Sequence, residues 1–165
     1  MHTFKYWLPV ALWMGIIFTM SSDFGSAAHT SRIIEPLVLW IKPNATGEEF
    51  ELVHLLVRKC GHLSEYAILA ILILRAIKRS RQQFYARLPW QAAGLALLVA
   101  AVYAATDEWH QSFVPGRTAT FGDVLIDCCG ALVGLTFMSL YGLLKSAGIP
   151  PFKRPVRQPA TQTGA

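Results

Sequence analysis

Long apolar runs separated by short polar segments dominate the chain, and four of these runs have the length of a membrane-spanning helix. They cover residues 6–22, about 52–77, 88–106 and 123–144. A helix needs about 20 residues to cross the hydrocarbon core of a bilayer. The first and third runs contain no charged residue, and Asp127 is the one charge inside the fourth. The pattern predicts an all-α protein, a four-helix transmembrane bundle.

The polar segments between and after the runs have their own patterns. Residues 32–42 read RIIEPLVLWIK, and their tryptophan, Trp40, is typical of a membrane interface. We expect a short interfacial helix or turn there on the outer face, limited in length by Pro36, which lacks a backbone donor. Residues 148–165 combine prolines with basic and small residues. They predict a disordered cytoplasmic tail after a transmembrane domain of residues 1–147.

The first apolar run also resembles a secretory signal peptide. Lys5 precedes it, and the small residues Ser26, Ala27 and Ala28 follow it as a cleavage site would. Cleavage there would start the mature protein near His29. The apolar part of a signal peptide is roughly 7–15 residues long, which is shorter than this run. The length therefore favours a retained first helix.

Composition supports a lipid environment. Apolar residues make up 53% of the 165 residues and charged residues only 15%, against about 25% charged in typical soluble domains. The net charge of +5 comes from basic residues beside apolar runs, without a motif for base or phosphate readout, so we exclude nucleic acid as a partner. Ten of the fifteen lysines and arginines fall on one side of the four runs. This bias predicts a multi-pass protein of the cytoplasmic (inner) membrane with both termini in the cytoplasm.

The three cysteines fall inside predicted membrane segments. They are Cys60, Cys128 and Cys129, without CxxC spacing. We interpret them as small apolar core residues rather than as disulfide partners or metal ligands.

The second apolar run carries ionisable groups at membrane depth. Its outer half contains Arg58, Lys59, His62, Glu65 and Tyr66. A charge at mid-bilayer costs about 2.5–3.5 kcal/mol, and spacings of three and four place most of these groups on one helix face. If the helix began late, near Gly61, the two basic residues would lie at the interface. That alternative still leaves the histidine and the glutamate without partners.

The third and fourth runs supply candidate partners at the same depth. These are Asp107, Glu108, His110, Gln111, Arg117, Asp123 and Asp127. If the third helix continues past Thr106, Asp107, His110 and Gln111 share a face. Gly130 and Gly134 then extend the face that carries Asp127 and form a GxxxG pattern, which lets a neighbouring helix approach closely. We therefore expect one polar cluster in the outer third of the bundle, serving either as a structural ion-pair network or as a functional site.

Two stretches of this cluster resemble the VanZ-like family of bacterial membrane proteins. The first is RKCGHLSEYA at residues 58–67, and the second, at residues 107–134, contains DEWHQ, PGR and DVLIDCCGALVG. The sequence departs from the family pattern at Asp127, where many relatives have asparagine. The resemblance implies a four-helix membrane fold and a role in the cell envelope. The family's namesake is associated with resistance to the antibiotic teicoplanin, a property that the resemblance does not transfer to this chain.

We weigh three functions for the cluster. The first is binding of an anionic, lipid-linked envelope component, such as a cell-wall precursor in the membrane lipid, or of a glycopeptide-related ligand. The residues expected to contact it are Arg58, Lys59, Tyr66, His110, Gln111, Arg117, Asp123 and Asp127. The second is a membrane-embedded hydrolase, with catalytic candidates His62, Glu65, Asp107 and Glu108. The third is a small transporter, which the fully apolar inner half of the second run disfavours.

The hydrolase hypothesis allows a divalent metal. His62 and Glu65 form one pair of ligands spaced three apart, Asp107 and His110 form another, and Asp123 could complete the set. Nitrogen and oxygen ligands of this kind hold Zn²⁺ or harder cations. Residues three apart on a helix are common, so the cofactor stays undetermined at this point, and so does the choice between an enzyme and a binding protein.

Overall fold

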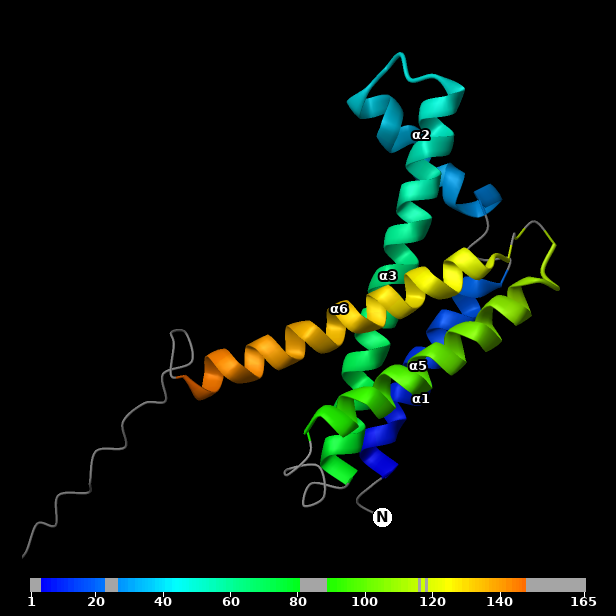
Figure 1. The fold of residues 1–165 in the computed structure, drawn as a ribbon. Coiled ribbons are helices and arrows are strands. Elements are labelled where there is room, and N and C mark those ends of the chain that lie inside the picture. The colour runs from blue at the N-terminus through cyan, green and yellow to red at the C-terminus, as the bar shows by residue number, and fades with distance from the viewer. Residues whose placement is uncertain (1–3, 23–26, 81–88, 116, 118, 148–165) are drawn as a thin grey trace, which may run out of the picture.

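All regular structure in the described part of the chain is helical. The computed structural model describes residues 4–22, 27–80, 89–115, 117 and 119–147. The helices are α1 (Phe4–Ser21), α2 (Ala27–Ile41), α3 (Gly47–Ser80), α5 (Pro89–Gln111) and α6 (Phe121–Ser146) (Figure 1). The all-α prediction is confirmed, and each of the four apolar runs coincides with a helix. The predicted tail, residues 148–165, lies outside the described residues.

Three of these helices are long and apolar enough to cross a membrane. They are α3, α5 from Trp90 onward, and α6. α1 is shorter, with 18 residues, and carries Lys5 in its first turn. With these spans and large apolar side chains exposed along every helix, the chain is a membrane protein.

Helix α3 is the centre of the structure, because α1, α2, α5 and α6 all pack against it. It is 34 residues long and unbroken, so a late helix start near Gly61 is wrong. Its true start is capped: the Thr46 amide donates to Glu49 Oε2 at 3.0 Å, and the Glu49 amide donates to Thr46 Oγ1 at 3.4 Å. This reciprocal capping box satisfies amides that the first turn leaves unpaired.

Helix α2 is longer than expected. Its 15 residues run through Pro36, so the prediction that this proline limits the helix is wrong. A proline inside a helix removes one backbone hydrogen bond, and Pro36 lies on the exposed side of α2, where that loss is tolerated. α2 packs beside the first half of α3, at the top of Figure 1.

Two stripes of small residues let the helices around α3 approach closely. In α5, the alanines at positions 92, 96, 100 and 104 are all buried and share one face. In α6, a Cβ at Gly130 would lie 2.2 Å from the Leu63 carbonyl oxygen, and one at Gly134 would lie 2.3 Å from that of Ala67. The predicted role of the GxxxG pattern is confirmed, because only glycine fits where α6 crosses α3.

The cysteine prediction is partly wrong. Cys60 and Cys129 are exposed and Cys128 is half-buried, and all three are free thiols. The lipid-facing surface of a membrane helix is as apolar as its core, so an apolar cysteine fits there equally well.

Candidate binding site at the junction of four helices

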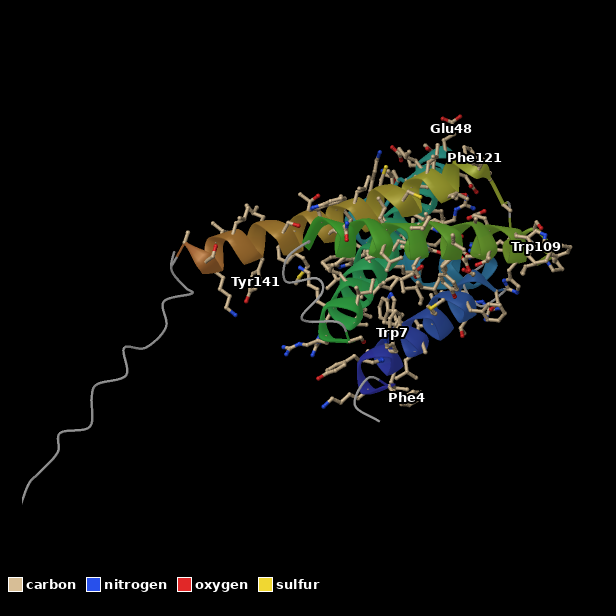
Figure 2. All side chains as sticks on the ribbon, turned by 60° about the horizontal axis from the view of Figure 1, so that its bottom comes forward. Phe4, Trp7, Glu48, Trp109, Phe121 and Tyr141 are labelled. Atoms are coloured by element: carbon tan, nitrogen blue, oxygen red, sulfur yellow. The ribbon has the colours of Figure 1, made fainter. Side chains whose placement is uncertain are left out.

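Buried polar side chains gather where four helices meet. α1 and α5 end there, α6 begins there, and α3 passes through with its first half (Figure 1). The buried polar and charged residues are Ser21, His62, Asp107, Glu108, Gln111, Asp123 and Asp127. In Figure 2, Trp109 and Phe121 lie at this end of the molecule, while Phe4 and Trp7 lie toward the opposite end of α1. The expectation of one polar cluster on three helices is confirmed, with α1 as a fourth contributor.

Asp123 pairs with two basic residues of α3. Lys59 donates to its Oδ1, and Arg58 donates to its Oδ2 at 3.4 Å. Thr120, the N-cap of α6, donates its hydroxyl to Oδ2 at 3.1 Å. Asp123 is only 1% exposed, and the positive end of the α6 dipole also favours a carboxylate here. These contacts join the start of α6 to α3.

His62 pairs with the deeper carboxyl of α6. Its Nδ1 lies 3.0 Å from Asp127 Oδ1, and both side chains are buried. Glu108 of α5 lies beside them, and its Oε2 accepts a hydrogen bond from the Thr120 amide at 3.0 Å. Ligating atoms of His62, Glu108 and Asp127 all lie within 4.8 Å of one another. The predicted metal set was different: among the described residues, Glu65, Asp107, His110 and Asp123 do not join such a group.

Asp107 ties α5 to α1. Its Oδ2 accepts hydrogen bonds from the Ser21 hydroxyl at 2.7 Å and from Gln111 Nε2 at 3.1 Å. Gln111 Nε2 also donates to Ser21 Oγ at 3.2 Å. All three side chains are buried, so this triangle is a compact polar contact between two helix ends.

Arg117 closes the same end of α1. Its Nε donates to the Ser21 carbonyl at 3.2 Å and its guanidinium to the Met20 carbonyl at 3.0 Å. These are carbonyls of the last helical turn, which carry partial negative charge and attract cations. Burial lowers the pKa of Arg117, and the nearby cation of Arg58 lowers it further. Two guanidinium groups are thus held in the same part of the site.

A cavity of about 410 Å³ opens beside these groups, between α1, α2 and α3. It is lined by Met20, Ser21, Thr30, Ile34, Glu51, His54, Leu55, Val57, Arg58, Gly61, His62, Glu65 and Arg117. Its volume falls in the range of about 300–1,000 Å³ that is usual for small-molecule sites. The wall combines apolar side chains with two arginines, Arg58 and Arg117, and two glutamates, Glu51 and Glu65, so the cavity is amphipathic.

The predicted site residues therefore divide into three groups. Four of them line the cavity: Arg58, His62, Glu65 and Arg117. Six lie behind or beside it in the paired network: Lys59, Asp107, Glu108, Gln111, Asp123 and Asp127. The remaining two make aromatic contacts. Tyr66 is fully buried with its ring 6.2 Å from that of Tyr103, and His110 stacks on Phe18 with 4.2 Å between ring centroids.

Several residues of the site were missed from the sequence. Thr120 was recognisable, because a threonine three positions before Asp123 is a helix-start signature. The cavity residues Ile34, Glu51 and His54 carry no such signal. Ile34 reaches the site because α2 folds back on the part of α3 that carries Glu51 and His54, and no local pattern specifies that contact.

Comparison with protein families supports the resemblance. The VanZ/LLP1 family model matches residues 6–143, which is most of the chain and includes the whole polar cluster. Comparisons with curated proteins and with solved structures gave no match. The match over all four apolar runs shows that the chain belongs to the VanZ/LLP1 family.

Proposed function

We propose that this protein spans the cytoplasmic membrane four times and binds an anionic, lipid-linked component of the cell envelope from the outer leaflet. The observation that carries the proposal is the amphipathic cavity, whose wall joins Arg58 and Arg117 to apolar side chains of α1, α2 and α3. A lipid-linked phosphate has the same two-part character, with a charged head on an apolar chain.

The proposed topology adds α1 to the three candidate spans. Eighteen residues at 1.5 Å each make a helix of about 27 Å, close to the roughly 30 Å of a hydrocarbon core. The start of α1 lies beside the end of α3, since Trp7 Nε1 donates to Ser80 Oγ at 3.1 Å. The two helices therefore run in opposite directions. With the basic residues on the cytoplasmic side, the cluster faces outward and α2 lies on the outer face.

Electrostatics favour an anion at the arginine wall. Burial lowers the pKa of Arg117, and repulsion from the nearby Arg58 lowers it further. A phosphate between them would relieve this repulsion and could accept paired hydrogen bonds from either guanidinium. Part of the cost is already offset by Asp123 and by the carbonyls at the end of α1. These contacts orient the two arginines before a ligand arrives.

The apolar wall favours a lipid over a free anion. Ile34 of α2 and Leu55 and Val57 of α3 line the cavity, and the surrounding surfaces of both helices expose further large apolar residues. Burying an acyl or prenyl chain there contributes about 0.8 kcal/mol per CH₂ group. A water-soluble phosphate would gain nothing from this wall.

Native mass spectrometry of the detergent-purified protein tests the proposal with polyprenyl phosphate as the probe. Arg58→Ala removes one guanidinium, and Ile34→Trp fills the apolar part of the cavity without changing charge. Arg58→Ala should weaken binding about tenfold or more, since a hydrogen bond to a charged group contributes about 1.5–3 kcal/mol. Ile34→Trp should also weaken binding, because its larger ring excludes the apolar chain. Arg32→Ala, at an exposed position of α2, is the matched control and should bind normally.

Two comparison ligands identify which half of the lipid is recognised. Neutral polyprenol should bind weakly because it lacks the anion, and inorganic phosphate should bind weakly because it lacks the chain. Equal binding of polyprenyl phosphate by the parent protein, Arg58→Ala and Ile34→Trp would overturn the proposal.

A further inference from the structure

Three ligating side chains converge behind the cavity from three different helices. His62 comes from α3, Glu108 from α5 and Asp127 from α6, and they are 6%, 5% and 0% exposed. Each offers an atom within 4.8 Å of the others. Side chains from separate helices meet at this depth only because of how the helices pack, so the grouping is not a by-product of local sequence.

Two carboxylate oxygens in this group lack a hydrogen-bond partner. Glu108 Oε1 and Asp127 Oδ2 are buried, and neither has a donor among the described residues. The second oxygen of each carboxyl group has a partner: Glu108 Oε2 accepts from the Thr120 amide, and Asp127 Oδ1 lies against His62 Nδ1. An unsatisfied buried oxygen of a carboxyl group costs about 1–3 kcal/mol or more, so native structures normally provide it with a donor or an ion.

The neighbouring cations are occupied elsewhere. Lys59 and Arg58 pair with Asp123. Asp107 Oδ2 accepts from the neutral donors Ser21 and Gln111, and its Oδ1 has no partner among the described residues. Within the described part of the chain, no lysine or arginine forms an ion pair with Glu108 or Asp127. Among the described residues, His62 is the ion-pair partner of Asp127, while Glu108 has no ion pair and interacts with the Arg117 cation only at longer range, so these two buried carboxyl groups are weakly compensated.

We infer that His62, Glu108 and Asp127 bind one divalent transition-metal ion of the Zn²⁺ or Mn²⁺ type. Imidazole nitrogen together with carboxylate oxygen suits these ions, whereas Mg²⁺ and Ca²⁺ prefer oxygen ligands alone. Ligand atoms on one such ion, at about 2.0–2.2 Å each, lie at most about 4.4 Å apart. In the tetrahedral geometry usual for Zn²⁺ the separations are shorter, about 3.4 Å, so the observed limit of 4.8 Å would have to shorten by up to about 1.4 Å through side-chain movements.

This ion would have two consequences for the protein. It would cross-link α3, α5 and α6 at the point where their polar groups meet, and it would supply the missing positive charge. His62 also lines the cavity, so the metal would lie next to the proposed lipid site. The inference goes beyond that proposed function and does not depend on it, because it concerns the ion alone.

Metal binding is measured on full-length protein purified through a tag without histidine, stripped with EDTA and washed in detergent. Zn²⁺ or Mn²⁺ is then titrated and followed by calorimetry and elemental analysis, with Mg²⁺ for comparison. We expect one tightly bound ion per chain and a thermal midpoint that rises with metal concentration, as ligand linkage requires. Mg²⁺ should bind much more weakly.

Glu108→Gln and Asp127→Asn keep side-chain size but remove a charged ligand, and each should lower the metal affinity at least about tenfold. Glu51→Gln and His54→Gln, on the cavity wall outside the three proposed ligands, are the matched controls and should bind metal normally.

A stripped parent protein without saturable Zn²⁺ or Mn²⁺ binding would overturn the inference. So would equal affinity in the parent, Glu108→Gln and Asp127→Asn. If protonated carboxyl groups satisfy each other instead of a metal, the thermal midpoint should not respond to EDTA or to added ion.

Discussion

A single added methyl group at Gly130 should force α6 away from α3. The Cβ of an alanine there would lie 2.2 Å from the Leu63 carbonyl oxygen and 2.9 Å from its Cα. Ordinary contacts begin at 3.4 Å, so the shortfall to the oxygen is more than 1 Å. The obstacle is backbone within a long helix, which cannot rotate aside as a side chain can. The two helices must separate, or both must bend.

The energetic cost follows from the packing. Overpacking a well-filled contact typically costs about 1–3 kcal/mol. For a chain of this size, each kcal/mol corresponds to roughly 2–4 °C in thermal midpoint. Gly130→Ala should therefore lower the midpoint by about 2–12 °C. Separation would also stretch the His62–Asp127 pair, since Leu63 directly follows His62 and Gly130 lies about one helical turn after Asp127.

The assay is thermal unfolding in detergent, followed by the loss of the monodisperse peak in size-exclusion chromatography. Gly142→Ala is the matched control, because it lies in the same helix with no atom within 4 Å of the added Cβ. Alanine is favoured over glycine by about 0.8–1.0 kcal/mol in a helix interior, so this variant should be as stable as the parent or slightly more stable. If Gly130→Ala unfolds at the same temperature as Gly142→Ala, the close crossing of α3 and α6 is refuted.

Two further predictions concern the start of α6 and the orientation of the chain. Thr120→Ala should destabilise the protein by about 0.5–2 kcal/mol, the usual cost of losing an N-cap, because the hydroxyl bonds both the amide and the carboxylate of Asp123. Thr120→Ser keeps the hydroxyl and should unfold near the parent temperature; equal losses in both variants would contradict this role. A reporter enzyme that is active only outside the cytoplasm, fused after Ala165, should be inactive, and a fluorescent reporter that folds in the cytoplasm should be bright. The reverse pattern would disprove a cytoplasmic C-terminus.

Apolar runs in the sequence located the helices because backbone hydrogen bonding in a helix is local. In lipid, the backbone N–H and C=O groups of an apolar run must form hydrogen bonds within the protein, and a helix forms them without any partner segment. The limits of α1, α3, α5 and α6 therefore follow the apolar runs. α2 was less predictable, because it is amphipathic and contains Pro36. Its length depends on packing against α3 as much as on its own residues.

Polar residues inside apolar runs also identified the site region. Lys59 and His62 could be placed on one face by spacing alone, and both meet carboxyl groups of α6. The same reasoning placed His110 with Asp107 and Gln111, yet His110 stacks on Phe18 instead. Positions three and four apart share a face only approximately, and the place where α1 packs on α5 decides which side chain enters the cluster.

The sequence by itself thus determined the membrane class, the helices, the family and the region of the polar cluster, since each depends on residues near one another in the chain. Only the tertiary structure decided which ligating groups meet. It set Glu108 beside His62 and Asp127 rather than Glu65 or Asp123, and it brought Ile34 of α2 to the cavity. The physical reason is the close crossing at Gly130 and Gly134. This crossing sets the depth at which α6 meets α3, and so which carboxyl groups face the histidine.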